Sequence, residues 1–260
     1  MNGSSRSIAI KKNIIASLFL KGISILVSLQ VVPLTINYIN PTRYGIWLTL
    51  SSIVAWLSYF DLGFAHGFRN RFAEAVAKGD MQLAREYVST TYVVLSLLFS
   101  SVFLIAIVVN HFVDWSAILN VDAAYSSELN IVFGILAFFF CLNIVASIFT
   151  TMLTANQKPA LASLIQTLGQ VFGFICIYIL TKTVPGNLDV LAFAFSGVPC
   201  FLLIIISIGM FLSGRYRHLS PSFHFVHFSL TKKIVGLGGQ FFIIMISMLF
   251  VFQLINIVIS

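Results

Sequence analysis

Long apolar stretches fill most of this chain, and they contain only two charged side chains, Lys21 and Asp61. A bilayer core about 30 Å thick is crossed by roughly 20 apolar residues in helix. Backbone polar groups in hydrocarbon must pair within their own segment, so such stretches become helices. We therefore predict an all-α polytopic membrane protein with about seven transmembrane helices. They are residues 13–36, 44–65, 87–109, 129–153, 159–180, 190–212 and 234–259.

The composition excludes other classes. The chain is 59% hydrophobic and only 9% charged, and a soluble domain of this length could not bury so much apolar surface. The strands of an outer-membrane barrel alternate apolar and polar residues, whereas residues 202–206 here are uninterrupted Leu and Ile.

The net charge of +7 is distributed unevenly. With the N-terminus inside, the segments on the inner side hold 12 of the 15 basic residues: Arg6, Lys11, Lys12, Arg69, Arg71, Lys78, Arg85, Lys158, Arg215, Arg217, Lys232 and Lys233. The outer loops hold Arg43 and Lys182. This bias follows the positive-inside rule, so we predict a cytoplasmic N-terminus. Because the charge reports topology, we do not expect nucleic-acid binding.

The predicted organisation is a cytoplasmic tail at 1–12, a six-helix bundle at 13–212, a cytoplasmic loop at 213–233 and a seventh helix at 234–260. Within the bundle, the loop 66–86 has apolar and basic residues near helical spacing. It predicts an amphipathic helix in the cytoplasmic interface, broken near residues 78–80. This helix either anchors the protein on anionic lipid or forms a basic rim that attracts a phosphate-bearing substrate.

Kinks are expected where proline lies within a span. Pro33 falls in the last turns of the first span, where we expect it to kink the helix or end it early. Pro199 lies deep in the sixth span and predicts a second kink. Such kinks often line a moving or water-filled region, although many are only packing features.

Polar residues within the spans follow helical stripes. In the first span the stripe is Ser17, Lys21, Ser24 and Ser28; in the fourth, Asn143, Ser147, Thr150 and Thr154; in the fifth, Ser163, Gln166, Gln170 and Gly173. Small and hydroxylated residues of this kind mediate close helix packing. Amides and charges are costlier to remove from water, so Lys21, Asn143, Gln166 and Gln170 favour a shared polar cavity. Lys21 either snorkels to the inner interface or pairs with Asp61.

The sequence contains no arrangement of residues that is typical of a catalytic or metal-binding site. Cys141, Cys176 and Cys200 all fall within spans and are typical of small packing residues. The histidines are scattered, and no nucleophile–base pair or phosphate-cradling glycine loop occurs in a suitable place. We expect no enzymatic activity, no bound metal and no cofactor.

Four short motifs resemble a known family: Gly-Ile-Trp at 45–47, Asp-Leu-Gly at 61–63, Gly-Phe-Arg-Asn at 67–70 and Ala-Lys-Gly-Asp at 77–80. Their order and their place around the end of the second span are similar to the N-terminal half of bacterial O-antigen and polysaccharide flippases. These belong to the multidrug/oligosaccharidyl-lipid/polysaccharide exporter superfamily. The hydropathy pattern agrees over the whole chain.

The resemblance implies a MATE-like fold of two helical bundles around a central cavity, and transport by alternating access. The substrate would be an undecaprenyl-diphosphate-linked oligosaccharide, moved across the bacterial inner membrane. This chain would hold one six-helix bundle and the first helix of the second, so we expect a truncated form or a fragment. Its partners would be the lipid-linked oligosaccharide, membrane lipids and other membrane proteins of polysaccharide assembly.

Candidate residues of the substrate path are Lys21, Asp61, Arg69, Arg71, Asn143, Gln166 and Gln170. The cations would meet the diphosphate and the amides would hydrogen-bond the sugars. Two alternatives stay open. A cation-coupled drug or metabolite antiporter of the same superfamily would want acidic groups within the spans, and Asp61 is the available one. A non-transporting component of a glycan-assembly complex would need no internal polar path.

Overall fold

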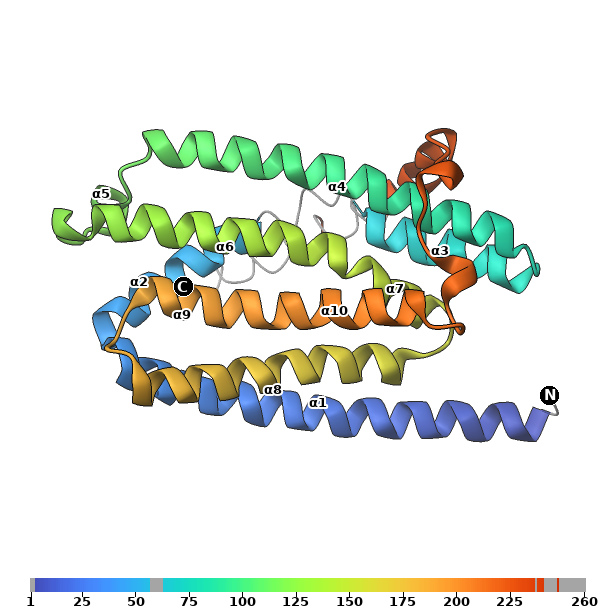
Figure 1. Ribbon diagram of the computed structural model, residues 1–260, viewed down its shortest axis with the longest axis horizontal. Helices are drawn as coiled ribbons and strands as arrows, with labels where there is room; N and C mark the ends of the chain where they lie inside the picture. Colours follow the sequence, from blue (N-terminus) through green and yellow to red (C-terminus); the bar gives the residue numbers. More distant parts are fainter. Residues whose placement is uncertain (1–2, 57–62, 237, 241–246, 248–260) are drawn as a thin grey trace.

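The computed structural model describes residues 3–56, 63–236, 238–240 and 247. Within these residues all regular structure is helical, and long helices lie side by side in one elongated bundle (Figure 1). Helical segments long and apolar enough to cross a membrane are Lys12–Ile39, Met81–Phe112, Ala123–Ala155, Pro159–Thr183 and Leu188–Leu212. The chain is thus an all-α, multi-pass membrane protein. The other predicted spans, 44–65 and 234–259, fall partly outside the described residues.

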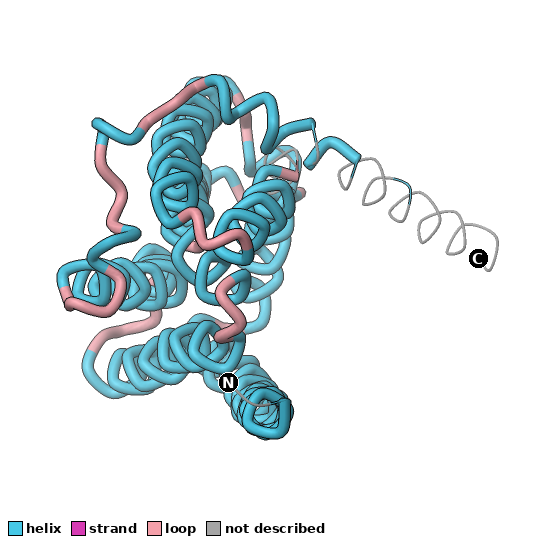
Figure 2. The backbone as a smooth tube through the Cα atoms, turned by 90° about the vertical axis from the view of Figure 1, so that its right-hand side faces the viewer, coloured by secondary structure: helices cyan, strands magenta, loops and turns pink. Residues whose placement is uncertain are grey.

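The helices run back and forth along the bundle. Their bounds are α1 Gly3–Ile39, α2 Pro41–Ala55, α3 Phe64–Ala77, α4 Met81–Phe112, α5 Trp115–Leu119, α6 Ser126–Ala146, α7 Ile148–Ala155, α8 Pro159–Thr183, α9 Leu188–Ala192 and α10 Val198–Leu212. The α3–α4 and α7–α8 turns and the segment after α10 lie at the end where α1 begins (Figure 1). We call this the basic end, because these segments carry the lysines and arginines predicted to be cytoplasmic. In the end-on view α1 lies at the edge of the bundle (Figure 2).

Side-chain caps explain two of the sharp reversals. Asn40, at φ 71°, begins α2, and its side-chain oxygen accepts a hydrogen bond from the Arg43 backbone N–H at 3.0 Å. Asp80 begins α4 in the same way, accepting from the Leu83 N–H at 2.9 Å. Such caps satisfy backbone donors that the first helical turn leaves unpaired. Gly79, at φ +78°, supplies the left-handed conformation that this turn requires.

A helix forms in the predicted loop 66–86, where α3 ends at Ala77. It is broken at residues 78–80 as predicted, with α3 before the break and α4 after it. α3 lies against α4 and α7. Phe64, Phe68 and Phe72 recur every four residues and are buried in that contact. The apolar face of α3 is therefore covered by the protein itself, and the place of α3 at the cytoplasmic interface stays a prediction.

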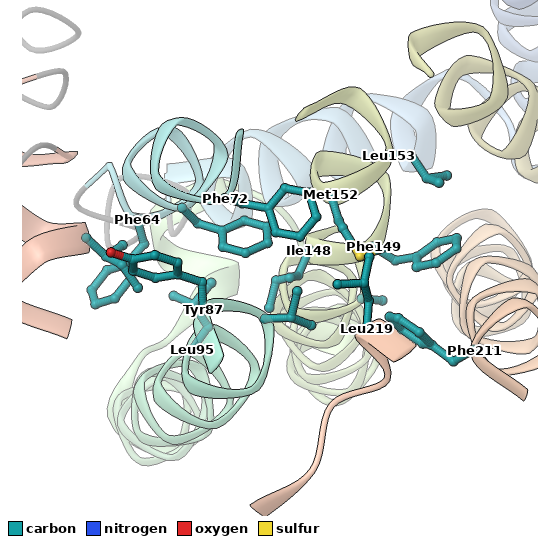
Figure 3. Packing of buried hydrophobic residues seen from close by; sticks show 14 of the residues in the cluster. Phe64, Phe72, Tyr87, Leu95, Ile148, Phe149, Met152, Leu153, Phe211 and Leu219 are labelled. Carbon is teal, nitrogen blue, oxygen red and sulfur yellow. The ribbon is translucent and has the colours of Figure 1, made fainter. Parts of the chain in front are cut away.

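Aromatic side chains dominate the core beside α3. Phe149 of α7 meets Phe211 of α10 edge to face, with ring centroids 5.0 Å apart, and Tyr216 closes the same cluster (Figure 3). Edge-to-face rings add to the stabilisation that burial alone provides. The outward surface is apolar as well: Phe19 is 70% exposed and Leu104 64%. A surface of this kind is suited to contact with lipid.

The two prolines behave differently. α1 continues through Pro33 to Ile39, so the helix does not end early. Pro199 is the second residue after a π-helical turn, Phe193–Gly197 (η3). Proline cannot donate the i→i−4 hydrogen bond, and its ring displaces the carbonyl of the residue four positions earlier. A π-turn just before it is a common way to accommodate that loss.

The segment 213–229 follows α10 and lies along the first half of α4. The Arg85 Nε donates to the Ser220 carbonyl at 2.9 Å, and the backbone N–H groups of Ser222 and His227 donate to the hydroxyls of Ser89 and Thr90 at 3.1 and 3.0 Å. We call this segment the strap. Its hydrogen bonds replace those that an irregular backbone would otherwise make with water.

The helical residues after the strap cross α3 at glycines. A Cβ atom on Gly67 would lie 2.1 Å from the Ile234 carbonyl oxygen, and one on Gly63 would lie 2.1 Å from that of Gly238. Gly63 and Gly67 form a G-x-x-x-G pattern, which allows two helix backbones to approach closely. This contact holds Ile234 and Gly238 close to the backbone of α3.

Candidate functional site

Polar side chains from three helices meet in one pocket. It has a volume of about 180 Å³ and lies where α3, α7 and α8 come together. Its lining residues are Ala65, His66, Arg69, Thr150, Thr151, Thr154 and Gln166. We call it the polar pocket. It brings together Thr150 and Thr154 from the stripe predicted on the fourth span, Gln166 from the stripe on the fifth span, and Arg69 from the predicted loop.

The chemistry of the polar pocket follows from its hydrogen bonds. The hydroxyls of Thr150, Thr151 and Thr154 all donate to backbone carbonyls one turn earlier, so their oxygens remain available as acceptors. Arg69 and Gln166 are exposed, and within the described residues their side chains have no hydrogen-bond or ion-pair partner. A guanidinium offers five N–H donors, and an amide offers two. The pocket therefore presents a cation and neutral donors beside hydroxyl acceptors.

A second pocket, of about 170 Å³, adjoins the polar pocket and shares Ala65 and Thr151 with it. Ser147 of the predicted stripe also lines it. Asn143, a predicted site residue, is exposed one helical turn before Ser147 and thus on the same side of the chain. Asn143 lines neither pocket, but it extends this polar face along α6.

The stripes of the first and fifth spans meet directly. The Ser24 hydroxyl donates a hydrogen bond to the side-chain oxygen of Gln170, which joins α1 to α8. Lys21 lies one turn earlier on α1 and is exposed, with no ion pair among the described residues. Asp61 lies outside the described residues, so the Lys21–Asp61 pair stays a prediction.

Arg71 is engaged elsewhere. Its guanidinium pairs with Glu74 at 3.0 Å, and its Nε donates to the Lys233 carbonyl at 3.4 Å. Lys78 also reaches Glu74, at 2.7 Å. The hydrogen bond from Lys78, and to a smaller extent the one from Arg71, holds the pKa of the Glu74 carboxyl below its ordinary value. Arg71 thus ties α3 to the chain beyond the strap, whereas Arg69 lines the polar pocket.

A larger pocket was not expected from the sequence. It has a volume of about 370 Å³ and lies between α1, α2 and α8, beside the π-turn. Gln170 lines it together with Ser28, Thr35 and Trp47. One signal could have found it, because Thr35 continues the stripe of the first span seven residues after Ser28.

Comparisons with known proteins do not assign this chain to a family. The chain matches no protein-family model, no curated protein and no solved structure. Among the described residues, no group of three or more His, Cys, Asp or Glu side chains could hold a metal ion. Arg69, Gln166 and the threonine hydroxyls equip the polar pocket for electrostatic and hydrogen-bonding recognition.

Proposed function

We propose that this protein is a transporter of lipid-linked oligosaccharide, of the undecaprenyl-diphosphate type, in the bacterial inner membrane, with its N-terminus in the cytoplasm. The observation that carries the proposal is the polar pocket on an otherwise apolar bundle. Arg69, Gln166 and the threonine oxygens of α7 converge there from separate helices. The motif resemblance supports the same substrate class.

A diphosphate-linked sugar matches this chemistry in two ways. Its phosphate oxygens accept charge-assisted hydrogen bonds, for which arginine is well suited. Its hydroxyls donate to and accept from amides and threonines. α3, α7 and the start of α8, whose residues line the polar pocket, lie toward the basic end of the bundle (Figure 1), where positive charge would raise the local concentration of an anionic substrate. Lys21 and Asn143 are exposed polar groups that would accompany the sugar along the bundle.

Exposed polar side chains on a membrane-embedded surface are costly in lipid. A second helical wall, supplied by more of the same protein or by a partner in polysaccharide assembly, would cover the face that carries Arg69 and Gln166. The proposal therefore includes such a wall, which would complete the cavity.

Binding to the purified chain in nanodiscs tests the proposal. The ligand is an undecaprenyl-diphosphate oligosaccharide, and the matched control substitutes Arg217, an exposed arginine in the strap at the same end. A hydrogen bond to a charged group contributes about 1.5–3 kcal/mol, so R69A is expected to weaken binding about 10- to 100-fold. R217A is expected to leave it within about twofold.

Other outcomes count against the proposal. Equal losses in R69A and R217A would indicate general attraction to positive charge, and absence of binding to the parent chain would favour a non-transporting assembly component. Preferential binding of a cationic drug would favour the antiporter. In cells, Q166A in the parent gene is expected to lower surface glycan.

A further inference from the structure

The pocket between α1, α2 and α8 has the size and lining of a ligand site. Its volume of about 370 Å³ is within the range of small-molecule pockets, about 300–1,000 Å³. The walls are mainly apolar and aromatic, including Val31, Phe174 and Ile177. Trp47 and Phe195 meet edge to face in its wall, with ring centroids 5.1 Å apart. Among the described residues no charged side chain lines it, so an ionic ligand would lack a partner from them.

An unpartnered hydroxyl lies in this apolar wall. Thr35 is only 1% exposed, and its Oγ1 forms no hydrogen bond among the described residues. Threonine in a helix usually donates to the carbonyl of the preceding turn, as Thr49 does to Gly45 at 3.0 Å. A buried hydroxyl without a partner is unfavourable. Thr35 is therefore poised for a polar atom of a ligand.

Gln170 supplies the second polar group. Its side-chain oxygen already accepts from Ser24, which leaves the amide N–H groups without a partner among the described residues. Amide N–H groups can only donate, so a ligand must offer them oxygen acceptors. The pocket thus combines an apolar body with neutral hydrogen-bonding groups on α1 and α8.

We propose that this pocket binds an uncharged amphiphile: a hydrocarbon chain against the apolar wall, with hydroxyl or ether oxygens on the Gln170 amide and the Thr35 hydroxyl. Neutral glycolipids and acylglycerols share this chemistry. The site is separate from the polar pocket, since the two pockets share no lining residue in the described part of the chain. The inference does not depend on the transport substrate.

Radiolabelled octyl glucoside, below its micelle concentration, tests the site on the full chain in phosphatidylcholine nanodiscs, with empty nanodiscs subtracted. We expect saturable binding that monooctanoylglycerol displaces and that octanoate and octyltrimethylammonium do not. Loss of one neutral hydrogen bond in T35V is expected to weaken binding about three- to tenfold. The matched control T49V removes a hydroxyl that is already paired and should bind as the parent does.

The T35V variant should fold, because valine has the same shape and removes an unpaired group; Q170M tests the same donors from the other helix. Tighter binding of octyl glucoside than of monooctanoylglycerol assigns a glycolipid, and the reverse order assigns an acylglycerol. Parent-like affinity in both T35V and Q170M would overturn the proposal. Equal displacement by the ionic octyl compounds, or no binding above empty nanodiscs, would overturn it as well.

Discussion

The glycine crossing of α3 with the helical residues after the strap allows a quantitative test by G67A. The added Cβ would lie 2.1 Å from the Ile234 carbonyl oxygen, 2.9 Å from its carbonyl carbon and 3.2 Å from the Gly238 nitrogen. All three are backbone atoms, so no side-chain rotation can relieve the contact. One of the two backbones has to move.

The size of the effect is the balance of two terms. Alanine in place of glycine within a helix gains about 0.8–1.0 kcal/mol, whereas overpacking a tight contact costs about 1–3 kcal/mol. G45A provides the matched control: Gly45 lies within α2, and nothing is within 4 Å of its added Cβ. G45A should carry the first term alone. The difference between the two variants therefore isolates overpacking, at about 1–3 kcal/mol.

Reversible unfolding in mixed micelles of dodecyl maltoside and sodium dodecyl sulfate measures both variants. We expect G45A to be at least as stable as the parent and G67A to be less stable than G45A by that difference. A disulfide between two introduced cysteines, one on α3 and one near residue 234, should also form more slowly in G67A. If the unfolding free energies of both variants change by the same amount in the same direction, the inferred close approach of Gly67 to the Ile234 carbonyl is wrong.

Three further predictions concern topology, acid response and the core. A reporter fused after Asp122 should be periplasmic and one fused after Arg217 cytoplasmic; a cytoplasmic reading at Asp122 would reject the topology. Lys78 and Arg71 lower the pKa of Glu74 from its ordinary 4.5. The stability that ionised Glu74 contributes is therefore present above pH 4.5 and is lost as the pH falls through the lower pKa of the folded state. In pH-dependent unfolding curves, E74Q should remove the loss of stability that comes from protonation of Glu74. Phe149 is fully buried, so F149A should lower the unfolding free energy by about 3–5 kcal/mol, and a loss below 1 kcal/mol would contradict its place in the core.

The sequence predicted the long helices well, because a bilayer imposes one length and one polarity on each span. The apolar runs around α4, α8 and α10 are confirmed, and the break at residues 78–80 follows from Gly79 and the Asp80 cap. The position of α3 could not be predicted from amphipathicity alone. Three phenylalanines on one face suit a lipid interface and a protein contact equally well, and tertiary packing decides between them.

The candidate site was predictable in its stripes but not in its groupings. Helical spacing correctly placed Thr150 and Thr154 on one side of the fourth span, and Gln166 joins them through contacts between distant segments. Arg69 and Arg71 looked equivalent in sequence. They separate because two residues correspond to about 200° of helical rotation. Of the two arginines, Arg71 is the one that reaches Glu74.

The strap has a mechanical consequence for the chain that follows it. Hydrogen bonds at Ser220, Ser222 and His227 clamp it to α4, and glycine contacts clamp the next helical residues to α3. A pull on the chain beyond Leu230 would therefore load α3 and α4 first and leave α10 shielded. Force would enter this bundle through α3, which carries Arg69, rather than through α10, the helix that precedes the strap in sequence.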